Sequence, residues 1–105
     1  MSRRTSDHHA VRLPGGTSLT RLPIGHADGH SWIFFVVTGK NMMDWHLADH
    51  VRIERDGSQA VPLEGGSTGS DTRALCDVVI AGGPSGITIN YFHGAELVDS
   101  EHFDE

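Results

Sequence analysis

Histidine is the residue with the most chemical capability in this sequence, with eight copies among 105 residues. Imidazole nitrogens are common ligands of zinc, copper, iron and nickel, so the spacing of the histidines decides whether they could share an ion. Two pairs are four positions apart, His26 with His30 and His46 with His50. Side chains at that spacing meet on a helix, whereas along a strand they lie roughly 13 Å apart.

The pair His46 and His50 is the better candidate for metal binding. The segment 41–50 is the best helix candidate in the chain because Asn41 could cap its start, with a loop as the alternative. A catalytic zinc needs three protein ligands, and His93, at the end of a predicted strand, is the candidate for the third. Zinc or another transition metal at these three histidines is therefore the alternative prediction. The main prediction is that the chain uses no cofactor.

Nucleophilic catalysis is not predicted. Cys76, the single cysteine, shares a predicted strand face with Ala74, Val78 and Ile80, and a thiol buried among apolar side chains has low reactivity. The sequence contains no Gly-x-Ser-x-Gly motif, and its glycine-rich segments lack the features of a phosphate-binding loop. We predict no catalytic residue, and expect no enzymatic activity outside the metal-binding alternative.

Asp77 is the unusual residue of the same predicted strand. It shares a face with Leu75 and Val79, although a carboxylate is costly to bury among apolar side chains. We therefore expect Asp77 to reach solvent or to pair with an arginine such as Arg73.

A group of apolar residues follows the strongly hydrophobic segment 30–38. Met42, Met43 and Trp45 are close in sequence and could form an exposed apolar patch. These three are the predicted interaction residues.

Composition excludes several classes of protein. The net charge of −6 argues against a dedicated nucleic-acid binder, because phosphates attract an excess of Lys and Arg. No apolar run reaches the ~18 residues that span a bilayer, and the polar first residues do not resemble a secretory signal. A single cysteine fits a reducing compartment. The expected location is the cytoplasm or a virion, without direct contacts to nucleic acid or membrane.

Short apolar segments separated by Gly and Pro predict a mostly β domain. The predicted strands are 11–13, 17–24, 30–38, a hairpin over 51–63, 73–81 and 86–93, and the segment 95–103 could be a final strand or a frayed helix turn. In 30–38, apolar residues occupy both faces, which is typical of a strand in the middle of a sheet. The strands 73–81 and 86–93 are joined by a short linker, so we expect an antiparallel pair. The predicted fold is a small antiparallel β-sandwich or barrel of six to seven strands with at most one or two short helices.

The hairpin over 51–63 could turn in two ways. A three-residue loop over 55–57 would place Val51 opposite Val61 and put the apolar residues of both strands on one face. A two-residue loop of Asp56 and Gly57 would place Val61 beside Arg52, so we prefer the longer loop.

The ends of the chain are predicted to lie outside the core. Residues 1–10 are expected to form a flexible arm, 11–98 a single β domain, and 99–105 an acidic tail. Within the domain, the segment EGGSTGSD at 64–71 is expected to be a flexible loop. The basic start and acidic end could meet within one chain or link neighbouring copies. Removing 1–10 is expected to leave the melting temperature almost unchanged.

The leading functional prediction is a non-enzymatic protein-interaction or assembly module. A compact β core, long polar loops and oppositely charged ends support it, and a phage or virion structural or decoration protein is its most specific form. The expected partner is a protein, through self-association or a larger assembly. The alternatives are a histidine-based metal-binding β-barrel protein, which could be an enzyme, and a small phage-encoded inhibitor of a host protein.

Overall fold

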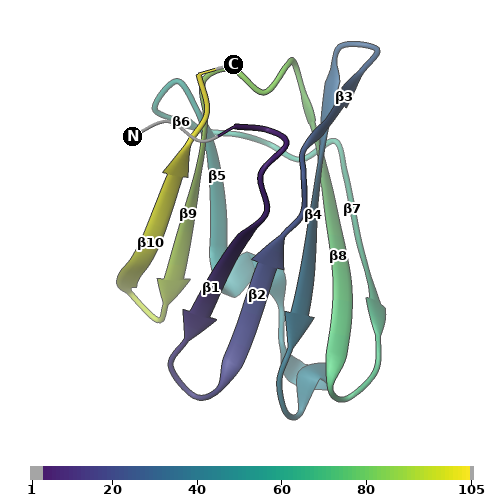
Figure 1. The fold of residues 1–105 in the computed structure, drawn as a ribbon, viewed down its shortest axis with the longest axis vertical. Helices are drawn as coiled ribbons and strands as arrows, with labels where there is room; N and C mark the ends of the chain where they lie inside the picture. The colour runs from purple at the N-terminus through teal and green to yellow at the C-terminus, as the bar shows by residue number, and fades with distance from the viewer. Residues whose placement is uncertain (1–3, 105) are drawn as a thin grey trace.

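The computed structural model describes residues 4–104, which form two antiparallel sheets packed face to face (Figure 1). The first sheet contains β1 (His9–Leu13), β2 (Thr17–Arg21), β3 (Gly25–Ala27), β4 (His30–Thr38), β7 (Glu64–Gly69) and β8 (Arg73–Ala81). The second contains β5 (Val51–Arg55), β6 (Ser58–Gln59), β9 (Ile87–His93) and β10 (Glu96–His102). The strand orders are β1-β2-β4-β8-β7, with β3 also paired to β4, and β10-β9-β5-β6. This arrangement confirms the predicted mostly β sandwich.

The core lies between the sheets and is supplied by alternate residues of the long central strands. In β4 the buried inward side chains include Ile33, Phe35 and Val37, while the residues between them are half-buried on the outer face. The inward face of β8 contains Cys76, which is buried as predicted. From the other sheet, β9 supplies the buried residues Ile87, Ile89 and Tyr91 to the same core. Two-fold alternation of burial is the pattern expected of a sheet with one packed face.

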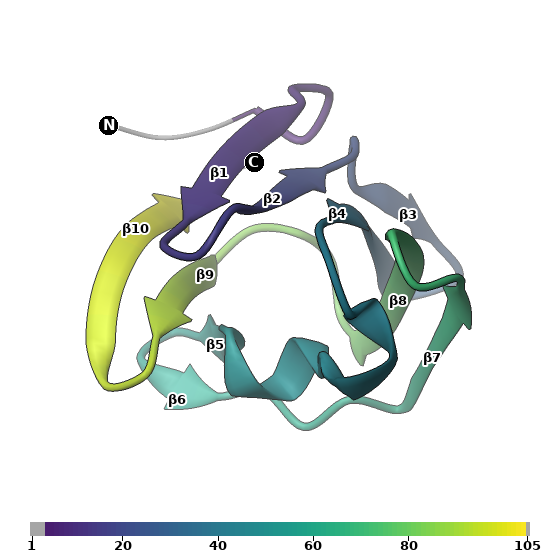
Figure 2. The same cartoon turned by 90° about the horizontal axis from the view of Figure 1, so that it is seen from below.

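The two lateral sides of the sandwich differ. On one side β1 lies near β9, and His9 of β1 contacts Asp99 of β10, so the first and last strands of the chain close the gap between the sheets (Figure 2). On the other side the segment 60–63 crosses from β6 to β7, the edge strand of the first sheet.

Several segments predicted to be loops or tails are strands. The segment 64–71 contains β7, which pairs with β8 in a regular antiparallel register although every residue of β7 is exposed. The predicted tail 99–105 overlaps β10, which confirms the strand alternative for 95–103, and the predicted arm 1–10 overlaps β1. Sequence hydrophobicity underestimates such strands because backbone hydrogen bonds, which any residue can make, hold them in place. The parts of these predictions that fall on residues 1–3 and 105 lie outside the described residues.

The hairpin after β5 turns over two residues, so the preferred three-residue loop is wrong. Arg55 pairs with Ser58, and both central residues, Asp56 (φ 50°) and Gly57 (φ 86°), have positive φ. Asp-Gly with this backbone is the type I′ turn, whose twist matches that of the strands beside it. The pairing ends at Gln59, and Val61 is 80% exposed instead of sharing a face with Val51.

The predicted pairing of 73–81 with 86–93 is also wrong. β8 pairs with β4 and β7, whereas β9 pairs with β5 and β10, so the linker between them crosses from one sheet to the other. The side chain of Arg55 holds this crossing. Its guanidinium donates hydrogen bonds to the carbonyl oxygens of Ala81 (2.8 Å), Gly83 (2.7 Å) and Ser85 (2.9 Å).

The best helix candidate, 41–50, forms two separate 3-10 turns, η1 (Met42–Asp44) and η2 (Leu47–Asp49). Asn41 makes no side-chain cap and adopts a left-handed conformation, and Trp45 is extended, so the chain cannot continue as one helix. Within residues 4–104 no helix has the length and apolar character needed to cross a membrane.

Candidate interaction surface

The three histidines predicted as metal ligands are not brought together. His46 is exposed before η2, and His93 is exposed at the end of β9. His50 stacks on Trp45, with ring centroids 4.9 Å apart, and its Nδ1 lies 3.1 Å from the carbonyl oxygen of Phe92. Because 41–50 is not an α-helix, the four-residue spacing does not place His46 and His50 on one face. Among residues 4–104, no cluster of three or more His, Cys, Asp or Glu side chains is placed to hold a metal ion.

The residues of the predicted interaction patch have different environments. Met42 is buried in the core, and Trp45 is half-buried and packs against the core. Met43 is 72% exposed. One member of the three is therefore accessible, and the other two contribute to packing.

A buried charged network joins the two sheets at the closed side. Arg21 of β2 and Glu101 of β10 form a two-pronged ion pair, with Nε to Oε1 at 2.8 Å and Nη2 to Oε2 at 2.7 Å. The hydroxyl of Tyr91 donates a further hydrogen bond to Glu101 Oε1 at 2.7 Å. Nη1 of Arg21 donates to the carbonyl oxygens of Asp7 and Leu22, and the guanidinium lies 4.9 Å from the ring centroid of Phe103.

This network is shielded from solvent and acts as a structural clasp. The side chains of Arg21 and Glu101 are both 0% exposed, so a substrate cannot reach them. Burial raises the pKa of Tyr91 far above its ordinary value, and the negative charge and hydrogen bond of Glu101 raise it further. Burial alone would lower the pKa of Arg21, but its hydrogen bonds and ion pair with Glu101 outweigh that effect and raise it. Both groups therefore keep their protons, which suits a structural role.

Sequence reasoning missed this clasp, although alternation offered a signal. Arg21 lies two residues after Leu19, and Glu101 lies two residues before Phe103, so each shares an inward strand face with a fully buried residue. Beside the clasp, His9 Nε2 lies 2.7 Å from Asp99 Oδ2. The first and last strands of the chain thus meet through a side-chain contact between His9 and Asp99.

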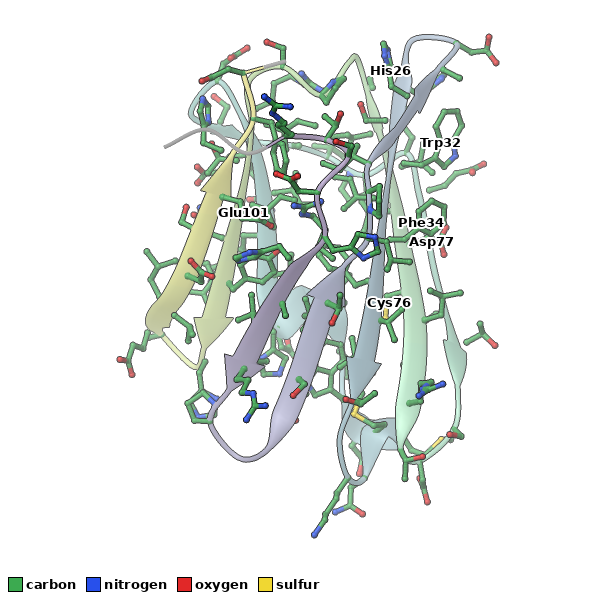
Figure 3. The ribbon with its side chains drawn as sticks, viewed as in Figure 1. His26, Trp32, Phe34, Cys76, Asp77 and Glu101 are labelled. Carbon is green, nitrogen blue, oxygen red and sulfur yellow. The ribbon has the colours of Figure 1, made fainter. Side chains whose placement is uncertain are left out.

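Several apolar side chains outside the core lie together on the outer face of β4 and β8. Trp32, Phe34 and Val36 alternate with the core residues of β4 and are half-buried on this face. Leu75 is 42% exposed on β8, opposite Val36. Figure 3 shows Trp32 and Phe34 grouped along these strands, away from Glu101 at the closed side. We call the outer side chains of β4 and β8 the outer face.

Asp77 lies in the middle of this outer face without a partner. It is half-buried, pairs in register with Phe34, and lies next to it in Figure 3. Its Oδ1 would be 3.1 Å from a Cβ built on Gly66 of β7, so the carboxylate leans over that glycine. Within residues 4–104 no hydrogen bond or ion pair reaches this carboxylate, so of the two expected outcomes Asp77 reaches solvent and does not pair with Arg73.

The edge beyond β7 is open and adjoins a groove. β7 is hydrogen-bonded to β8 on one side only, and contains three glycines but no lysine or proline that would discourage a further strand. Next to it, a groove of about 430 Å³ opens between the sheets. Its apolar lining includes Leu47, Val51, Ile53, Ala60 and Val78, with Gly65 and Gly66 of β7 at its border.

Comparisons of this chain with protein-family models, with curated proteins and with solved structures found no match.

Proposed function

We propose that this chain is a non-enzymatic protein-interaction module that binds its partner through the outer face and the open β7 edge. The observation that supports the proposal is the position of Asp77. A half-buried carboxylate without a partner, among apolar side chains and beside an unpaired strand edge, is stabilised when a second molecule supplies the missing donor.

Two further properties of this surface favour a polypeptide partner. An edge strand offers backbone donors and acceptors in the repeat that an extended chain can match. Exposed Leu75 and the half-buried rings of Trp32 and Phe34 offer apolar and aromatic area beside that edge, and aromatic side chains are enriched in protein interfaces. The clasp at the other side stabilises the sandwich independently of this surface.

The partner could be a different protein or another copy of this chain. Self-association would correspond to the assembly form of this function, as in a virion shell, and a foreign partner to a binding or inhibitory form. Sedimentation velocity over a wide range of concentrations distinguishes the two, because a module for a foreign partner stays monomeric.

Site-specific photo-cross-linking in the cells of origin tests the proposal. A photoreactive side chain replaces Leu75 on the outer face, and a matched one replaces Leu97, which is 53% exposed on β10 at the other side. We expect one discrete protein adduct from position 75 and none from position 97. The proposal is wrong if neither position gives an adduct or if both give the same set of adducts.

A further inference from the structure

We infer that the partner contributes an extended strand to the β7 edge, with an arginine or lysine that crosses Gly66 to pair with Asp77. This inference rests on the proposed function and names the chemistry of the bound segment. The basic residue is flanked on both sides by apolar residues that point to the inner face of the sheet, and the one opposite Gly65 points toward the groove. The recognised sequence is therefore apolar–basic–apolar in an extended conformation.

The position of the basic residue follows from register. Gly66 pairs with Asp77, so a residue of an added strand opposite Gly66 points to the outer face, as Asp77 does. The Cβ of that residue lies roughly 5 Å from the Cβ position of Gly66, over which the Asp77 carboxylate already leans. A side chain at position 66 would block this path. Glycine leaves the space above position 66 empty, and the long flexible side chain of Arg or Lys can extend through that space to Asp77.

The charge of the crossing residue follows from its surroundings. Asp77 can accept hydrogen bonds from a guanidinium or ammonium group, and charge-assisted bonds of this kind are the stronger ones. Phe34 lies directly opposite Asp77 on β4, so an aromatic side chain borders the carboxylate on the side away from Gly66. The chain carries a net charge of −6, which adds a general attraction for a basic segment.

The neighbours of the basic residue follow from alternation along a strand. Residues opposite Gly65 and Ser67 point to the inner face, because these two positions pair with the inward residues Val78 and Cys76. Gly65 and Val78 border the groove of about 430 Å³. An apolar side chain opposite Gly65 would enter the groove and lose contact with water, and one opposite Ser67 would lie on the same inner face as the buried Cys76. A carbohydrate could stack on Trp32 and Phe34, but it would use neither the strand edge nor the groove.

Selection from a peptide library tests this inference. Displayed nonapeptides with five randomised central positions are selected on the full wild-type chain, and the best peptide is synthesised in three forms. One has the selected sequence, one has its basic residue replaced by citrulline, and one has N-methyl groups on alternate backbone nitrogens. We expect enriched peptides to contain Lys or Arg between apolar residues, and the other two forms to bind at least about tenfold more weakly.

Variants of the chain locate the bound peptide. Asp77→Asn and Gly66→Val should each weaken the selected peptide about tenfold or more, while the matched change Glu96→Gln on β10 leaves its affinity within about twofold. Circular dichroism and the melting temperature establish that each variant is folded. A folded Asp77→Asn variant with undiminished affinity overturns the inference. So does a library without enrichment, or one enriched in peptides that lack a basic residue.

Other occupants of the surface give different results. A dimer of the chain that Asp77→Asn leaves intact would identify a second copy as an occupant that does not use Asp77 and would overturn the inference. Binding of a soluble polysaccharide that Phe34→Ala and Asp77→Asn both abolish would also overturn it. A partner that cross-links at position 75 but binds Asp77→Asn normally would leave the proposed function standing and refute only the basic strand.

Discussion

Replacing Glu101 by glutamine should destabilise the fold severely while changing its shape little. The glutamine side chain has nearly the size of glutamate, but it removes the negative charge that faces the buried guanidinium of Arg21. It also places an amide group where Glu101 accepts hydrogen bonds at 2.7 to 2.8 Å from Nε, Nη2 and the hydroxyl of Tyr91. At least one of these three donor groups then faces the amide nitrogen of the glutamine, which is also a donor.

The size of the effect follows from the cost of an unpaired buried charge. Removing one partner of a buried ion pair typically costs about 3–5 kcal/mol. Both side chains of this pair are 0% exposed, so solvent cannot replace the lost partner. A domain of about this size has roughly 5–15 kcal/mol of total stability, and each kcal/mol corresponds to about 4–8 °C in melting temperature. The Glu101→Gln variant should therefore melt at least about 12 °C below the wild type.

Urea denaturation followed by tryptophan fluorescence measures the free energy of unfolding. A matched triple variant, Arg21→Met with Tyr91→Phe and Glu101→Leu, replaces the whole polar cluster by apolar side chains of similar volume. It should be more stable than Glu101→Gln by about 2 kcal/mol or more, because no unpaired charge remains buried. A loss of less than about 1 kcal/mol in the free energy of unfolding for Glu101→Gln would refute the claim that the clasp is shielded from solvent.

Further predictions concern buried side chains and side chains whose contacts hold a strand or a linker in place. Because the folded state raises the pKa of Tyr91, only the unfolded chain releases this proton near pH 10. The free energy of unfolding should therefore fall as pH rises above ~10. Phenolate absorbance, which reports the single tyrosine, should appear only when the chain unfolds. Cys76, 2% exposed, should react with a thiol reagent orders of magnitude faster in denaturant than in buffer, and rapid labelling of the folded chain would contradict its burial. Arg55→Met should cost about 1–2 kcal/mol in urea denaturation by removing three hydrogen bonds to the β8–β9 crossing, and an unchanged midpoint would show that they contribute nothing. Removing residues 1–10 should lower the melting temperature by at least about 5 °C, because it shortens β1 and deletes the His9–Asp99 contact. This result would be contrary to the expectation from sequence. Scanning calorimetry of the full and shortened chains measures the difference in melting temperature.

Prediction from sequence succeeded where side-chain alternation is strong. The apolar pattern of 30–38 predicted a central strand, and β4 lies between β2 and β8 with its alternate residues buried. The burial of Cys76 followed from the same reasoning. In such strands the hydrophobic effect and the backbone pattern favour the same structure.

Prediction failed where partners distant in sequence decide the structure. Nothing near Glu101 shows that Arg21, 80 residues away, will neutralise it, so an inward acidic residue resembles a solvated tail. The glycine-rich β7 resembles a linker because its pairing with β8 depends on backbone bonds and not on side chains. The linker after β8 has the length of a hairpin loop, and its crossing between sheets depends on contacts from Arg55.

The difference between the two sides of the sandwich has a consequence for local motion. β7 has one hydrogen-bonded neighbour and no buried residue, so separating it from β8 exposes little apolar surface. Segments of this kind open at a small fraction of the global free energy of unfolding, whereas strands fixed by buried side chains open only when the whole domain unfolds. Amide hydrogens of β7 should therefore exchange with solvent much faster than those of β9 around Tyr91. A strand added at this edge would slow the exchange of β7 first, so the time course of exchange would reveal a bound partner before any change in the core.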